Sequence, residues 1–205
     1  MAITTIIGLK HLDIAKQRLA PHLGDLERRR LMLRMLESAA AAARSAGLGP
    51  VAIATTEPSG PAIAEKLGVA LLSDGGLPWN QGLVHALASL PSTPERVMFL
   101  AGDLPLLRDE ELGAFAAASP APGVGIARAR DAGTNALLLT PADAIMPSFG
   151  STSSSEVHAA AARASGLAHV VVELPGLTLD VDTVDDARDA GLLLVSGTGR
   201  APRAG

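Results

Sequence analysis

Short apolar runs alternate with longer segments of helical periodicity along most of the chain. The apolar runs predict β-strands at residues 3–9, 51–54, 69–72, 97–100, 123–127, 135–139 and 170–173. The segments between them predict helices at residues 25–46, 61–67, 80–90, 110–118, from the Ser-rich stretch 148–155 to about 165, and at 183–195. Strands that alternate with helices in this way indicate an α/β domain with a mostly parallel sheet.

The longest predicted helix, residues 25–46, stops before Gly47, a residue type that commonly ends helices because it adopts left-handed backbone angles. Leu26, Leu33 and Leu36 have a spacing that places them on one side of this helix. We therefore expect these three leucines to form its buried face.

The apolar run at residues 97–100 predicts a strand that is buried on both faces, as in the middle of a parallel sheet. Ala101 and Gly102 follow and occupy little room, so the backbone there can lie against a ligand. Asp103 then places a carboxylate at the carboxyl end of the strand, where open α/β sheets bind their ligands. Taken alone, Asp103 is better explained as the cap of a turn.

A second acidic cluster changes the interpretation of Asp103. Asp180 and Asp182 flank one apolar residue, so in an extended segment both carboxylates point to the same side. Three carboxylates at the ends of two strands can hold a hard divalent cation against a phosphate. Directly afterwards, Thr183 and Asp186 have the spacing of a capping box at the start of the last predicted helix.

The composition limits the class of protein. A chain of 205 residues with 48% hydrophobic residues fits one domain with a full core, which we place at residues 1–195, followed by a disordered C-terminal tail at 196–205. An aromatic content of 2% and a net charge of −4 argue against nucleic acid as a partner. The chain has no cysteine, no targeting signal and no apolar run of membrane-spanning length, so we expect a cytoplasmic protein with no membrane partner.

The loop after the first strand is basic. The chain lacks the P-loop motif, and its G-x-G fragments lack the third glycine and the strand-to-helix setting, which argues against a P-loop NTPase and an NAD-type site. Lys10, Lys16 and Arg18 instead predict an anion-binding loop, with arginine as a fork for phosphate oxygens. A solvated basic loop explains this segment equally well in isolation. Together with the three acidic residues, the loop favours a triphosphate held between these cations and a metal ion.

Five motifs occur in the order of one known family. They are Lys10 with residues 15–21 (AKQRLAP), residues 102–107 (GDLPLL), 133–139 (GTNALLL), Phe149-Gly150-x-x-Ser153, and 179–183 (LDVDT). From about residue 3 to 190 the chain resembles the 2-phospho-L-lactate guanylyltransferase family, CofC, called FbiD in mycobacteria. That family makes a precursor of the deazaflavin coenzyme F(420).

The resemblance implies a three-layer, Rossmann-like nucleotidyltransferase fold of the nucleotide-diphospho-sugar transferase type, similar to that of molybdenum-cofactor guanylyltransferases. The implied reaction is attack by the phosphate of a three-carbon phosphoacid on the α-phosphate of GTP, with release of pyrophosphate. The acceptor is phosphoenolpyruvate in actinobacterial members and 2-phospho-L-lactate in archaeal members. A homodimer is compatible with the resemblance.

The resemblance also implies roles for individual residues. Mg²⁺ would be held by Asp103, Asp180 and Asp182, and the catalytic residues would be Lys16, Arg18 and Asp103. The nucleotide would be bound by Lys10, Lys16, Arg18, Asn80 and Gly82, and the phosphoacid by Thr134, Gly150 and Ser153.

The chain departs from the family pattern at three places. Pro78 and Trp79 stand where the family usually has Gly-Leu, next to the expected guanine pocket. The spacing from the Ser-rich turn to His158 is one residue longer than usual, so Ser154 is an alternative to Ser153 in the phosphoacid site. His158 itself is best explained as a helix-packing residue, and no catalytic role is predicted for it.

Two other functions fit parts of the sequence. One is a related nucleotidyltransferase that acts on a molybdenum-cofactor or sugar-phosphate acceptor, although such families normally open with a Gly-rich loop in place of residues 10–13. The other is a non-catalytic nucleotide-sensing module, which would be expected to have lost the acidic residues that this chain retains.

Overall fold

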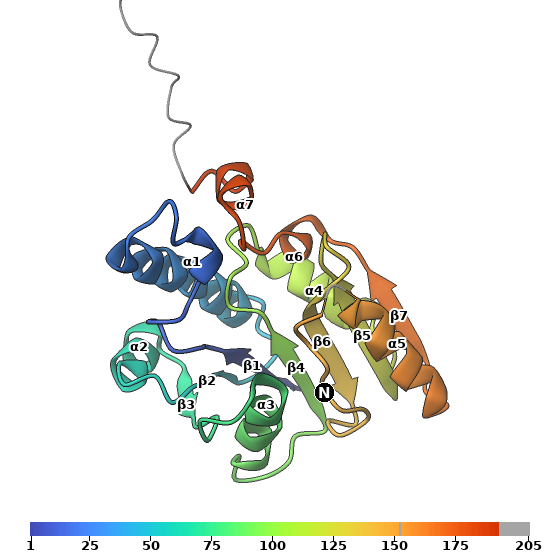
Figure 1. The fold of residues 1–205 in the computed structure, drawn as a ribbon. Coiled ribbons are helices and arrows are strands. Elements are labelled where there is room, and N and C mark those ends of the chain that lie inside the picture. The colour runs from blue at the N-terminus through green and yellow to red at the C-terminus, as the bar shows by residue number, and fades with distance from the viewer. Residues whose placement is uncertain (152, 193–205) are drawn as a thin grey trace, which may run out of the picture.

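The computed structural model describes residues 1–151 and 153–192. Seven strands in this part of the chain form one sheet in the order β3-β2-β1-β4-β6-β5-β7 (Figure 1). The strands are β1 (Ile3–Gly8), β2 (Val51–Ala54), β3 (Ala70–Leu72), β4 (Arg96–Leu100), β5 (Gly123–Arg128), β6 (Thr134–Thr140) and β7 (His169–Val172). All seven predicted strands are therefore present, with ends that differ by at most one residue from the predictions.

The direction of strand β6 determines which residues lie beside the carboxyl end of the central strand, β4. The pairs β1–β2, β1–β4, β2–β3 and β5–β7 are parallel, whereas β6 runs antiparallel to both β4 and β5. Leu100 at the end of β4 pairs with Ile7 on one side and with Ala136 on the other. The start of β6 therefore lies beside the ends of β1 and β4, at the edge where α/β sheets bind ligands.

Helices cover both faces of the sheet, which makes a three-layer α/β fold (Figure 1). They are α1 (Asp25–Ser45), α2 (Gly60–Leu67), α3 (Trp79–Ala88), α4 (Asp109–Ala118), α5 (Ser154–Ala164), α6 (Pro175–Thr178) and α7 (Val184–Asp189), with a 3-10 turn η1 at Gln17–Leu19. Residues of α1, α2, α4, α6 and α7 share one core cluster with the sheet, and residues of α3 and α5 share the other.

The central strand β4 contributes to both core clusters. Met98 and Leu100 belong to the cluster under α1 and α4, while Val97 and Phe99 belong to the cluster under α3 and α5. This alternation is the period of two that strand geometry imposes. All four side chains are at most 3% exposed, which confirms the prediction of a strand buried on both faces.

The expected buried face of α1 is only partly correct. Leu36 is fully buried and Leu33 is partly buried, but Leu26 is 60% exposed. The buried stripe instead runs through Met32, Met35 and Ala39, because Leu26 in the first turn faces away from the sheet. Leucine spacing alone did not distinguish this stripe from the neighbouring one.

The C-terminal region also differs from the prediction. The last helix begins after Thr183 as expected, but α7 ends at Asp189, and the short helix α6 was not predicted. Residues 193–195 of the predicted helix and the predicted tail at 196–205 lie outside the described residues. In the part of the chain that is described, no helix combines the length and the apolar character needed to span a bilayer.

We predict that Leu36→Ala lowers the free energy of unfolding by about 2–5 kcal/mol, because it leaves a cavity between α1 and the sheet. Leu26→Ala is the matched control on the same helix and should change it by less than about 0.5 kcal/mol. Urea titration of the two variants measures both values. Equal losses of stability would contradict the assigned buried face.

Candidate functional site

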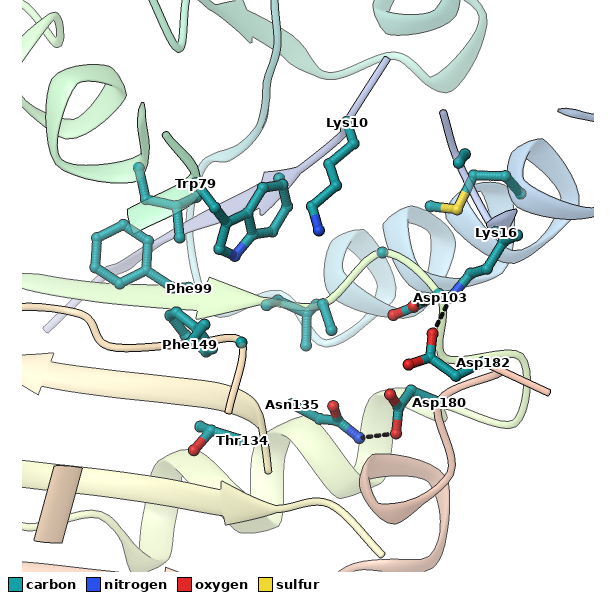
Figure 2. Close-up of a pocket in the computed structure, with 18 of the residues that line it drawn as sticks. Lys10, Lys16, Trp79, Phe99, Asp103, Thr134, Asn135, Phe149, Asp180 and Asp182 are labelled. Atoms are coloured by element: carbon teal, nitrogen blue, oxygen red, sulfur yellow. Dashed lines mark hydrogen bonds and ion pairs between the residues drawn. The ribbon is translucent and has the colours of Figure 1, made fainter. Parts of the chain in front are cut away.

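A cavity of about 380 Å³ lies at the carboxyl ends of β1 and β4 and at the start of β6 (Figure 2). One end of the cavity is charged, with Lys16 beside Asp103, Asp180 and Asp182. The other end is aromatic, lined by Trp79, Phe99 and Phe149. The chain contains only one Trp, three Phe and no Tyr, so three of its four aromatic residues line this cavity.

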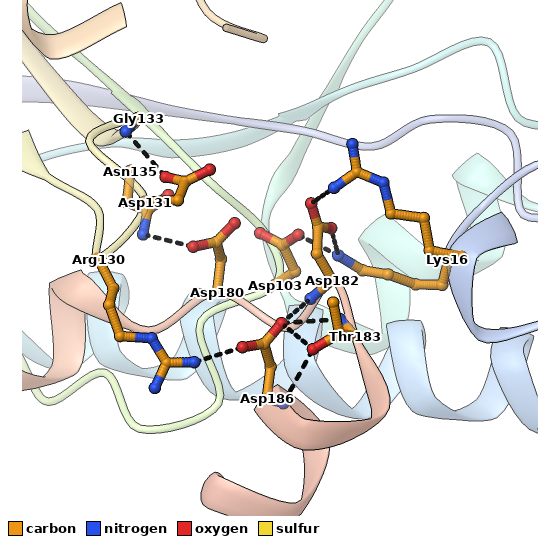
Figure 3. A network of polar contacts seen from close by, with 11 residues as sticks. Lys16, Asp103, Arg130, Asp131, Gly133, Asn135, Asp180, Asp182, Thr183 and Asp186 are labelled. Carbon is orange, nitrogen blue, oxygen red and sulfur yellow. Dashed lines mark hydrogen bonds and ion pairs between the residues drawn. The ribbon is translucent and has the colours of Figure 1, made fainter. Parts of the chain in front are cut away.

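Lys16 is the cation at the centre of the charged end. Its backbone adopts left-handed angles (φ 54°, ψ 41°), an uncommon conformation for a residue other than glycine. The Nζ atom donates to Asp103 Oδ2 and, at 3.0 Å, to Asp182 Oδ1 (Figure 3). Burial alone would lower the pKa of Lys16, but the charges of Asp103 and Asp182 outweigh it and raise the pKa above its usual value.

Asp180 is the least compensated of the three carboxylates. Its Oδ1 accepts a hydrogen bond of 3.2 Å from the Asn135 amide, which also donates to the carbonyl of Leu177. Burial, followed by the nearby charge of Asp103, raises the pKa of Asp180 to about 6. Among the described contacts, the Asp180 carboxylate has an amide partner and no cationic partner.

A separate set of hydrogen bonds fixes the segment that carries Asp182 (Figure 3). Asp186 Oδ2 accepts from the backbone nitrogens of Asp182 and Thr183 at 3.1 and 2.7 Å, and Thr183 accepts from the Asp186 nitrogen. This is the predicted capping box of α7. Burial alone would raise the pKa of Asp186, but these bonds and the Arg130 ion pair lower it, so Asp186 stays a charged acceptor.

The three carboxylates fit a hard divalent cation. One oxygen from each of Asp103, Asp180 and Asp182 lies within 4.8 Å of the others. Carboxylate oxygens are the ligands preferred by Mg²⁺ and Mn²⁺.

Glu57 anchors the basic loop. It follows β2, and its buried carboxylate accepts from the Leu12 nitrogen at 2.8 Å and from the Ser59 hydroxyl at 2.7 Å. Burial alone would raise the pKa of Glu57, but the hydrogen bonds from Leu12 and Ser59 lower it. The backbone between Lys10 and Lys16 is thus tied to the loop that follows β2.

Trp79 closes the aromatic end of the cavity. Its ring packs against Gly8, where an added Cβ would come within 2.3 Å of the indole, so a larger residue at the end of β1 would displace the ring. Lys10 Nζ lies 5.1 Å from the centre of the indole ring, within the range of a cation–π contact. One basic residue of the loop is thereby placed between the two ends of the cavity (Figure 2).

A sequence-family model described as "Guanylyl transferase CofC like" matches residues 3–204. The chain belongs to the CofC-like guanylyl transferase family. It is 33% identical over 192 residues to a phosphoenolpyruvate guanylyltransferase of Sphaerobacter thermophilus, covering 92% of each chain. It is 36% identical over 192 residues to a phosphoenolpyruvate guanylyltransferase of Mycobacterium sp. strain KMS, covering 90% of this chain and 84% of that protein.

Solved structures support the nucleotidyltransferase fold. A Desulfovibrio desulfuricans G20 protein described as a nucleotide-diphospho-sugar transferase matches with a TM-score of 0.74 and 16% identity, over 100% of this chain and 92% of that one. Rv0371c from Mycobacterium tuberculosis, in a complex with manganese, matches with a TM-score of 0.55 and 19% identity, over 93% and 97% of the chains. The predicted fold class is confirmed.

Most of the predicted site residues line the cavity. These are Lys10, Lys16, Arg18, Asp103, Thr134, Gly150, Asp180 and Asp182. Arg18 extends from the turn η1, is 74% exposed, and donates to Asp182 at 3.0 Å. The structure therefore brings the basic loop and both acidic segments into one place.

Three predicted residues lie elsewhere. The Asn80 amide is engaged with the backbone of Phe149, donating to its carbonyl at 3.1 Å and accepting from its nitrogen at 2.9 Å. Gly82 packs against Asp74, where an added Cβ would meet Asp74 at 3.1 Å. Ser153 is exposed at the start of α5, whereas the alternative, Ser154, is buried and donates to Thr134 at 3.1 Å. None of Asn80, Gly82 and Ser153 lines the cavity.

Sequence reasoning missed several residues that build the site. Asn135 and Glu57 were not singled out, and their partners are distant in sequence, 45 residues away for both Asp180 and Leu12. Trp79 was noticed only as a departure from the family pattern. A useful signal would have been the rarity of aromatic residues, because a lone Trp in such a chain marks an unusual position.

His158 supplies a pH-dependent prediction. It is fully buried, and burial lowers its pKa to about 4 from 6.5. Below about pH 6.5 this histidine binds a proton in the unfolded chain but not in the folded chain. The stability that the folded protein has with a neutral His158 is therefore complete above pH 6.5 and is lost as the pH falls towards 4. The loss amounts to about 3 kcal/mol at most.

Urea unfolding of the wild type and of His158→Gln between pH 7 and pH 4 measures this contribution. The variant lacks the titrating ring, so the wild type should lose stability more steeply than the variant on acidification. Parallel stability curves over this range would show that His158 does not remain neutral in the folded protein.

Proposed function

We propose that this chain transfers GMP from GTP to the phosphate of a three-carbon phosphoacid, with release of pyrophosphate, as a step of coenzyme F(420) biosynthesis in the cytoplasm. The observation that carries the proposal is the meeting of three carboxylates with Lys10, Lys16 and Arg18 in one cavity of a CofC-family chain. Residues 1–195 would act as one nucleotidyltransferase domain.

The proposed reaction asks for positioning and charge neutralisation more than for proton transfer. The acceptor phosphate is already ionised at neutral pH, so a strong general base is not needed. Attack on the α-phosphate of GTP brings several negative oxygens together, and groups that are fixed in advance lower the cost of that approach. Lys16, buried and held in one geometry by two carboxylates, is such a group.

We assign the metal-binding role to Asp103, Asp180 and Asp182 and propose Mg²⁺ as the physiological ion. Bound there, Mg²⁺ would supply a compact positive charge that neutralises phosphate oxygens. Lys10 and Arg18, both exposed at the mouth of the cavity, would bind the outer phosphates of the nucleotide. Trp79 offers a face on which a purine base can stack.

The acceptor site would lie at the start of β6. Thr134 and Gly150 line the cavity, and Ser154 contacts the Thr134 hydroxyl from α5. We propose that Ser154, and not Ser153, supports the phosphoacid site, because Ser153 is exposed.

Replacing Asp103 or Asp182 with Asn keeps the side-chain shape and removes the charge that would hold the metal ion. We predict a loss of turnover of about 100-fold or more with an intact fold. Asp185→Asn, an exposed residue paired only with Arg188 among the described contacts, is the matched control and should retain activity. Near-normal turnover of the Asp103 and Asp182 variants in Mg²⁺ would exclude the three-carboxylate site.

GTP should be strongly preferred over ATP as the nucleotide. This expectation rests on family membership and on the identity of the relatives as guanylyltransferases. Pyrophosphate release measured with each nucleotide, at the same metal and acceptor concentrations, tests it. Comparable rates with ATP would point to the alternative, a nucleotidyltransferase of the same fold with another specificity.

Phosphoenolpyruvate should be the better acceptor and 2-phospho-L-lactate the weaker one, because the relatives are phosphoenolpyruvate guanylyltransferases. The two acceptors share a phosphate and a carboxylate and differ in shape at C2 and C3. A pocket wall separates such close analogues by only about 1–3 kcal/mol, so the weaker acceptor should still react. A higher kcat/KM for 2-phospho-L-lactate would reverse the assignment of the acceptor, and no turnover with either would reject the proposed function.

A further inference from the structure

His158 lies behind the cavity, between two segments that line it. It is on α5, is fully buried, and does not itself line the cavity. One ring nitrogen, Nδ1, is 3.0 Å from the Thr134 hydroxyl at the start of β6. The other, Nε2, is 2.9 Å from the backbone nitrogen of Ser148. The ring therefore connects the start of β6 with the loop that leads to Phe149 and Gly150.

The partner on one side determines the proton position on the ring. The backbone N–H of Ser148 can only donate, so Nε2 of His158 must accept and carries no proton. A neutral imidazole then has its proton on Nδ1, which donates to the oxygen of Thr134. Protonation of the ring would place a second donor against the Ser148 N–H. The lowered pKa of His158 agrees with the neutral form.

Ser154 makes a second hydrogen bond to the same oxygen. Its side chain is buried, with 1% of the residue exposed, and its hydroxyl donates to Thr134 Oγ1 at 3.1 Å. In the described part of the chain, no other partner of the Ser154 hydroxyl is present. Reversing this bond would leave a buried hydroxyl proton without an acceptor, which is costly.

The Thr134 oxygen thus accepts two hydrogen bonds, from His158 and from Ser154. Both lone pairs of the hydroxyl are used, and its own proton must point elsewhere. Thr134 lines the cavity, and among the described contacts its hydroxyl has no protein acceptor. The remaining proton is therefore directed to the cavity.

We propose that His158 is a positioning residue that makes the Thr134 hydroxyl an obligate hydrogen-bond donor to an anionic oxygen of the acceptor substrate. A carboxylate or phosphate oxygen accepts such a bond, whereas a hydroxyl or amine that needs to donate is rejected. The identity of the substrate rests on the proposed function; the donor role of Thr134 rests on the contacts of His158 and Ser154.

His158 also contacts the loop that leads to Phe149 and Gly150, and the test must separate the two effects. Its ring packs edge-to-face on Phe149, with 5.2 Å between centroids, and accepts from Ser148. Asn80 holds the same loop through two hydrogen bonds to the Phe149 backbone. The loop therefore retains one anchor when the histidine is replaced.

Two substitutions divide the functions of the ring between them. His158→Asn places an amide N–H near the position of Nδ1, which retains the donor to Thr134 and removes the acceptor for Ser148. His158→Gln places an amide oxygen near the position of Nε2, which retains the acceptor for Ser148 and removes the donor to Thr134. Asn is one methylene shorter than Gln, so the thermal stabilities of both variants are measured as the control for packing.

We expect kcat/KM for phosphoenolpyruvate to fall about 10- to 100-fold in His158→Gln, through KM for this acceptor, because Thr134 can then turn its proton inward. KM for GTP should stay within about twofold, since no nucleotide contact is altered. His158→Asn should retain most of the acceptor affinity. Equal losses in the two variants, or an unchanged KM for phosphoenolpyruvate in His158→Gln, would overturn the proposal.

A second measurement needs neither turnover nor a variant. Imidazole ¹⁵N chemical shifts of His158 in the wild-type protein distinguish the two neutral tautomers, and we expect the proton on Nδ1 at neutral pH. A proton on Nε2 would overturn the proposal whatever the activity. If the wild type shows this tautomer and no guanylyl transfer, the proposed function fails while the donor role of Thr134 stands.

Discussion

Three carboxylates within 4.8 Å of one another repel each other, and the site depends on the one buried ammonium that the fold places among them. Lys16 comes from the loop after β1, and its partners Asp103 and Asp182 lie 87 and 166 residues away in sequence. The ion cluster therefore joins the N-terminal loop to the central strand and to the segment before α7. Among the described contacts Asp180 has none with Lys16, and burial, followed by the charge of Asp103, raises its pKa to about 6.

The rest of the cavity is built by residues that hold loops in place from behind. Glu57 accepts a hydrogen bond from the backbone of the basic loop, and Asp186 accepts one from the backbone nitrogen of Asp182. Asn80 makes two hydrogen bonds to the backbone of Phe149. Each of these side chains accepts hydrogen bonds from, or donates them to, backbone groups of a segment that lines the cavity. The geometry of the charged groups is thus set by hydrogen bonds to neighbouring backbone, which is how a site made largely of loops is kept rigid.

Local sequence patterns predicted the strands and the position of the acidic residues, but not the contacts between residues that are distant in sequence. The strands followed from apolar runs, and the common side of Asp180 and Asp182 followed from the period of an extended chain. The antiparallel direction of β6 could not be predicted, because side-chain alternation is the same in both directions. That direction brings Thr134 to the end of β4. Asn80 was assigned to the nucleotide by resemblance, whereas its amide is engaged 69 residues away at Phe149, a pairing that only tertiary packing determines.

In the arrangement proposed above, the three aspartates Asp103, Asp180 and Asp182 form one metal site next to Lys16. Anomalous scattering at the manganese edge, from crystals grown with Mn²⁺ and a non-hydrolysable GTP analogue, tests it most directly, and manganese is the metal present in the Rv0371c complex of the same fold. We expect an anomalous peak within coordination distance of Asp103, Asp180 and Asp182, with Lys16 adjacent to the nucleotide phosphates. A bound nucleotide without such a peak, or a manganese ion held by other residues, would contradict it.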